Sequence, residues 1–134
     1  MEPRTPAPWS PGPRPGGAPR GRVVFARYAR GVLDTSPFLS AVEQFADRLR
    51  AAPQSRLQRG AAARALALAQ ELAARAQERE EPGTEPRVMP DAGMFAVSDQ
   101  LTVAAHDLAQ VLRTPGETEE ATALVSEART EAGL

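Results

Sequence analysis

A proline-free, Ala-rich stretch from Ser55 to Glu81 constrains the fold of this chain more than any other feature. At about 1.5 Å per residue, a helix over this stretch is roughly 40 Å long. Its apolar residues form two adjacent stripes, which together are wider than the apolar face of about 100° that an ordinary surface helix carries. We therefore expect a central helix at 55–81 that packs against two neighbours.

The second of these stripes is the predicted partner-binding surface. It lies beside a first stripe that begins at Leu57, and few large apolar residues elsewhere in the chain are left to cover it. Small Ala side chains let two helices approach closely, so a homodimer is one form of the expected partnership. Trp9 is added as an anchor, because an exposed Trp is a common interface hot spot. The residues predicted on this stripe are Ala62, Leu66, Ala69 and Ala73.

Three further helices are expected. Ser36 as N-cap and Pro37 in the first turn predict a helix at 37–52. A continuous apolar face from Met94 to Leu112 predicts a second, which we extend back to Asp91. A weaker C-terminal helix has few large apolar residues. The predicted ranges of these helices are 37–52, 91–113 and 115–132.

Capping patterns and helix breakers define the predicted boundaries. Ser55 with Gln58, and Thr114 with Glu117, have the spacing of a capping box. Gly60 inside the central helix costs about 1 kcal/mol relative to Ala, so that helix has Gly60 as an alternative start. Residues 82–90 contain three Pro and are predicted to form a flexible linker.

The N-terminal residues differ in composition from the rest of the chain. Residues 1–21 contain seven Pro and four Gly. Such a segment buries too little apolar surface to offset its chain entropy, and a disordered Pro/Gly/Arg-rich arm is expected. Val23 to Leu33 reads either as a strand or as a short helix or docked segment, and the second interpretation is favoured because a lone strand pair is marginal. The predicted domain at 22–134 is an all-α, small antiparallel helical bundle.

Positive charge is concentrated towards the N-terminus. Residues 1–33 hold six Arg against one Glu, a net charge of +5, whereas the remainder holds ten Arg against sixteen acidic residues, a net charge of −6. A second group of Arg lies at 48–64, a segment that contains no acidic residue. These residues suggest an alternative function, sequence-nonspecific nucleic-acid binding. They are Arg14, Arg20, Arg22, Arg27, Arg30, Arg48, Arg50, Arg56, Arg59 and Arg64.

Several classes of function are disfavoured by what the chain contains. The absence of Cys and Lys excludes disulfides, thiolate metal sites and the usual Lys-containing phosphate loop. His106, the single His, is expected on the solvent face of its helix. No apolar run has the length of a membrane span, and a cytoplasmic location is expected. We therefore predict no enzyme activity, no cofactor and no metal.

The combined prediction is a non-catalytic cytoplasmic module that acts by protein–protein interaction, in an accessory or regulatory role. The partner is an unidentified protein, and no membrane association is expected. Nucleic-acid binding remains the alternative. No resemblance to a known family emerges from the residues.

Overall fold

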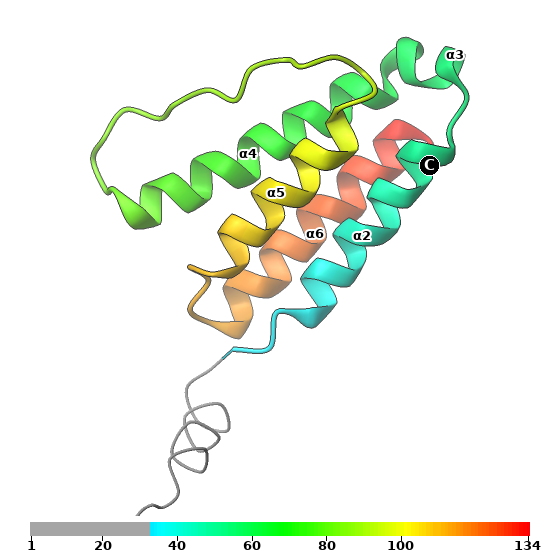
Figure 1. Ribbon diagram of the computed structural model, residues 1–134. Coiled ribbons are helices and arrows are strands. Elements are labelled where there is room, and N and C mark those ends of the chain that lie inside the picture. Colours follow the sequence, from blue (N-terminus) through cyan, green and yellow to red (C-terminus); the bar gives the residue numbers. More distant parts are fainter. Residues whose placement is uncertain (1–32) are drawn as a thin grey trace, which may run out of the picture. The chain divides into compact units, whose positions relative to one another are not determined.

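The structure is a computed structural model that describes residues 33–134 (Figure 1). Over this range the chain forms helices and no strand. The predicted all-α helical bundle is thus confirmed. Predictions that concern residues 1–32, including Trp9 and five of the ten Arg residues, lie outside the described residues. The compact unit is Asp34–Leu134.

Four long helices and two short turns of helix make up this unit. No helix in the described range is both long and apolar enough to cross a membrane. The elements are α2 at Ser36–Ala51, α3 at Gln54–Arg56, the π-type turn η2 at Leu57–Ala61, α4 at Ala62–Glu80, α5 at Val97–Ala109 and α6 at Pro115–Ala132.

The long helices form a four-cornered bundle in which α2 packs on α5 and α6, and α4 packs on the same two helices. Ion pairs fix the directions. Arg64 near the start of α4 contacts Glu131 near the end of α6. Arg50 at the end of α2 contacts Asp99 at the start of α5 at 3.4 Å. These two pairs of helices are therefore antiparallel, as predicted.

The other two neighbouring pairs run in the same direction, which the prediction missed. Near the ends of α4 and α5, Arg79 Nη1 donates to the carbonyl of Val111 at 3.2 Å. Near the ends of α2 and α6, Arg48 Nη1 donates to the carbonyl of Leu134 at 3.2 Å. The linker at 81–96 carries the chain back beside α4, so that α5 starts near the start of α4 (Figure 1). A long crossover of this kind permits parallel neighbours in a bundle.

Three glutamine side chains hold this linker against the helices. Gln77 lies in α4 with 6 % of its surface exposed, and it donates to the carbonyl of Glu85 at 3.0 Å and accepts from Arg87 N at 2.9 Å. Gln70 donates to the carbonyl of Met89, and Gln100 donates to that of Pro90, each at 2.8 Å. The segment predicted as a flexible linker is thus hydrogen-bonded to α4 and α5 between Glu85 and Pro90.

Large side chains from α2, α4 and α5 fill the core. Phe38 and Phe45 of α2, Leu72 of α4 and Leu101 of α5 are completely buried. Helix α6 contributes mainly small residues, and Val125 is its one large fully buried side chain. The prediction that α6 brings little apolar bulk is confirmed.

The capping predictions have different outcomes. At α6, Glu117 N donates to Thr114 Oγ1 at 3.1 Å and Thr114 N donates to Glu117 Oε1 at 3.3 Å, so this capping box is confirmed. Helix α2 begins at Ser36 itself, and Asp34 Oδ1 accepts its N–H at 3.0 Å. The expected cap by Ser55 is wrong, because α3 follows Pro53 without a side-chain cap.

Three predicted helix boundaries also differ from the structure. The central helix does not run unbroken from Ser55: it breaks at Gly60, whose φ is +140°, and α4 starts at Ala62, close to the alternative start predicted at Gly60. Helix α5 starts at Val97, not at Asp91, because Gly93 adopts a φ of +100° and the Asp91 carboxylate accepts its N–H at 2.8 Å. Helix α5 also ends at Ala109.

Candidate functional site

The predicted partner-binding stripe on α4 is divided by the fold. Ala69 is completely buried, so its assignment to a binding surface was wrong. Ala69 belongs to the buried core of the bundle, in which α4 packs on α5 and α6. Ala73 is half-buried and borders a hollow beneath the linker, beside Val88 and Met89. Only Ala62 and Leu66 share one surface hollow.

This hollow, which we call the Leu66 groove, lies between the start of α4 and the segment that enters α5. It has a volume of about 270 Å³. Ala62, Leu66 and Met94 are half-buried at its walls, with one side of each packed against the core. Leu57 and Val97 are buried and complete the apolar lining. Two polar residues, Gln58 and Asp91, stand at its edge.

Gly60 and Gly93 shape the Leu66 groove. The break at Gly60 turns the chain so that Leu57 and Ala61 both remain buried on either side of it. At the opposite wall, Ala96 N donates to the carbonyl of Gly93 at 3.0 Å and closes a turn. Positive φ values at both positions are readily reached only by Gly.

Phe95 projects from this turn into solvent. Its exposed fraction is 74 %, although its chain neighbour Met94 lines the Leu66 groove. Sequence reasoning missed Phe95 because it placed Met94 and Val97 on one face of a continuous helix. The Asp91-Ala92-Gly93 run was the signal for a turn, since Asp accepts hydrogen bonds two residues on and Gly allows positive φ.

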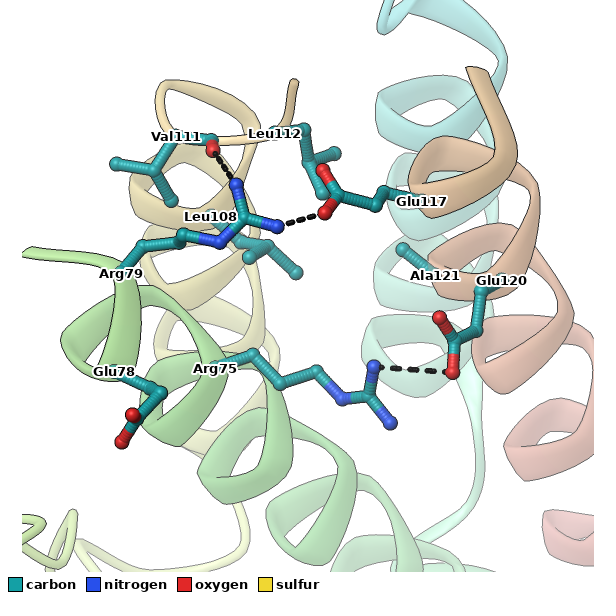
Figure 2. A pocket seen from close by; sticks show the side chains of 9 residues that line it. All are labelled: Arg75, Glu78, Arg79, Leu108, Val111, Leu112, Glu117, Glu120 and Ala121. Atoms are coloured by element: carbon teal, nitrogen blue, oxygen red, sulfur yellow. Dashed lines mark hydrogen bonds and ion pairs between the residues drawn. The ribbon is translucent and has the colours of Figure 1, made fainter. Parts of the chain in front are cut away.

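A second hollow, of about 250 Å³, lies where the ends of α4 and α5 meet the start of α6 (Figure 2). Its floor is apolar and includes Leu108 and Leu112, and two arginines of α4 lie across it. Arg79 pairs with Glu117. Arg75 contacts Glu120 at 3.4 Å, and Figure 2 shows its guanidinium directed at this carboxylate.

Both arginines in this second hollow are paired with carboxylates. Glu71, four residues before Arg75, accepts from Arg75 Nε at 2.9 Å. This hydrogen bond, followed by the charges of Glu71 and Glu120, raises the pKa of Arg75 above its ordinary value. Both arginines thus have partners on the protein, and the hollow functions as an ion-paired clasp that joins α4 to α6.

The Arg residues at 48–64 are occupied in a similar way. Arg48 donates to the carbonyl of Leu134, and Arg56 donates to that of Gly133 at 2.7 Å. Arg64 pairs with Glu131, and Arg50 pairs with Asp47 and Asp99. Three of these arginines therefore hold the end of α6. Arg59 has no side-chain partner among residues 33–134.

The described chain offers no constellation typical of a metal or acid–base site. Within residues 33–134, no group of three His, Asp or Glu side chains is arranged to hold a metal ion. His106 lies exposed on α5, on the face opposite the core, as the helical pattern predicted. Comparisons of the chain with protein-family models, curated proteins and solved structures gave no match.

Proposed function

We propose that this chain is a non-catalytic helical module of the cytoplasm that binds a protein partner through the Leu66 groove, in an accessory or regulatory role. The observation that carries this proposal is an apolar hollow that the side chains of residues 33–134 leave open. Its wall residues Ala62, Leu66 and Met94 are each only half-buried.

Burial of this surface supplies the free energy of binding. Removing apolar area from water contributes about 25 cal/mol per Å². The Leu66 groove is large enough to receive one or two apolar side chains of a partner, and Gln58 and Asp91 at its edge offer polar contacts around them. An apolar centre with a polar rim is the usual composition of a protein–protein interface.

A pair of matched variants tests the proposal. Ala62→Glu places a charge inside the Leu66 groove, whereas Ala67→Glu makes the same change at an exposed position of α4 outside it. Both positions tolerate Glu in a helix, since Glu has good helix propensity. Circular dichroism will verify that both variants keep wild-type helicity.

The assay is capture of partners from the native lysate, treated with and without nuclease. We expect the wild type and Ala67→Glu to capture the same protein in either lysate, and Ala62→Glu to lose it. Equal capture by Ala62→Glu would contradict the proposal. Capture that disappears with nuclease would favour the alternative instead.

Nucleic-acid binding is the second candidate, and one observation supports it. Arg59 is exposed and has no side-chain partner in the described range, so its guanidinium is available for a phosphate. The neighbouring Arg56 and Arg64 are engaged with the end of α6, which reduces the electropositive surface that this region offers. Arg48 and Arg50 are likewise engaged, with the carbonyl of Leu134 and with Asp47 and Asp99. The other five arginines of this candidate lie before residue 33.

A further inference from the structure

Phe95 and the Leu66 groove form a projection and a hollow on the same part of the surface. The turn that carries Phe95 is also a wall of the groove, because Met94 and Val97 on either side of it line the hollow. Phe95 itself does not fill the hollow and leaves 74 % of its surface in water. A two-fold axis beside this wall would bring each Phe95 opposite the hollow of the other copy.

We propose that the partner in the Leu66 groove is a second copy of this chain, and that the two copies exchange Phe95 side chains reciprocally. This inference rests on the proposed function and names its partner. In a two-fold contact the same patch serves both subunits, so it must contain a projection and a matching hollow. The wall of the Leu66 groove meets that requirement.

The charges at the groove support the same occupant. Asp91 stands at the edge, and its carboxylate accepts only the N–H of Gly93 among the described residues. Arg59 follows Gln58, which lines the groove, but does not line it itself, and it has no partner within residues 33–134. Arg59 and Asp91 are both exposed, and neither forms an ion pair within residues 33–134. A two-fold contact through the Leu66 groove would bring Arg59 of each copy towards Asp91 of the other, so that the opposite charges complement each other.

The size of the contact indicates a weak dimer. A buried aromatic side chain removes about 150–250 Å² from water, and stable complexes bury at least roughly 1,200 Å² in total. Two Phe95 side chains with the groove walls that they cover fall below or near that limit. We therefore expect an equilibrium between monomer and dimer that shifts over the micromolar range.

Sedimentation velocity of the full chain across the micromolar range tests the proposal. Phe95→Ser removes the projecting side chain, and Val103→Ser is the matched control because Val103 is an exposed apolar residue, at 57 %, that does not line the groove. We expect the wild type and Val103→Ser to associate alike, and Phe95→Ser to weaken association about a hundredfold, since each dimer loses two anchors.

Charge exchange provides the second measurement. Arg59→Asp or Asp91→Arg alone juxtaposes like charges and should weaken the dimer, whereas the double variant should restore it. Restoration also shows that loss of the Asp91 turn hydrogen bond is not the cause. A wild type that stays monomeric, a Phe95→Ser variant that associates normally, or a double variant that fails to recover would each overturn the proposal.

The two proposals fail separately. A monomeric wild type that still captures a foreign protein, with Ala62→Glu abolishing capture, would overturn the dimer and leave the proposed function standing. A dimer that Phe95→Ser leaves intact would overturn reciprocal exchange, whatever the lysate experiment yields.

Discussion

Replacing Gly60 by Ala tests whether the helix breaks at this position, as in the structure, or runs through it unbroken, as the sequence pattern predicts. If the helix ran uninterrupted through this position, Ala would stabilise it by about 1 kcal/mol, because Gly is the poorer helix former. In the structure Gly60 has a φ of +140° and breaks the helix between η2 and α4. Ala is strained at such a φ, so the two readings predict opposite signs.

The magnitude follows from the backbone alone. A Cβ at Gly60 would meet no atom within 4 Å, so no steric clash with other residues contributes. Non-Gly residues in sparsely populated backbone regions cost on the order of 1–3 kcal/mol. Ala recovers about 0.4–1 kcal/mol by restricting the unfolded chain. We expect a net destabilisation of about 1–2 kcal/mol.

Thermal unfolding measured by circular dichroism gives the sign directly. For a domain of this size, 1 kcal/mol shifts Tm by about 4–8 °C, so Gly60→Ala should lower Tm by at least about 4 °C. Gly116→Ala is the matched control. Gly116 lies in the first turn of α6 without a positive φ, and a Cβ there would only approach Thr114 Oγ1 at 3.9 Å. That change should raise Tm by a few degrees.

A rise in Tm for both variants would refute the break at Gly60. The central helix would then run straight from Ser55, and the wall of the Leu66 groove formed by η2 would be placed wrongly. A fall in Tm for both variants would mean that the control position is itself strained, which its geometry contradicts.

Three further predictions concern ionisable side chains. Arg79→Met removes the ion pair with Glu117 and should lower the free energy of unfolding by about 1–2 kcal/mol in urea titrations. The control is Arg87→Met: the Arg87 side chain is 69 % exposed, so loss of its ion pair with Glu81 should cost less than about 0.5 kcal/mol. Equal losses would contradict the role of the Arg79–Glu117 pair in joining α4 to α6. Asp34 accepts a backbone hydrogen bond that lowers its pKa below the ordinary value. Its contribution to stability is therefore present above the unfolded-state pKa, about pH 4, and is lost as pH falls through the lowered pKa. Asp34→Asn should make the urea midpoint depend less on pH in this acid range, and an unchanged pH profile would contradict the assignment. If nucleic acid is the partner, the wild type should shift DNA or RNA in a gel at about 50 mM salt and Arg59→Gln should reduce the salt slope by about 1; no shift by the wild type eliminates this alternative.

The sequence predicted those elements whose signals are local. The end of α2 before Pro53, the capping box at Thr114 and the apolar spacing of Phe38 and Phe45 each depend on a few neighbouring residues, and all are present in the structure. The start of α5 was missed because the apolar face continued in register through Met94. Gly93, with its φ of +100°, overrides that register locally.

The candidate site was less predictable because it depends on which surfaces the fold covers. Ala62, Leu66, Ala69 and Ala73 are equivalent on a helical wheel, yet one is completely buried and three are half-buried. Ala69 lies in the packed core, whereas Ala73 borders the linker, whose course depends on hydrogen bonds from glutamines far apart in the sequence. Periodicity within one helix contains no information about either.

The arginines at 48–64 show how the same local pattern can serve opposite purposes. Without acidic residues between them they resemble a surface for phosphates, but the end of α6 lies beside them and supplies carbonyls and a carboxylate. Because α2 and α6 are parallel, both helices present the carbonyl-rich ends of their dipoles at the same end of the bundle, where cations are favoured. The positions of Arg48, Arg56 and Arg64 are thus explained by their contacts with the end of α6. Arg59 has no partner among residues 33–134, so its guanidinium is available both for a second copy of the chain and for a phosphate.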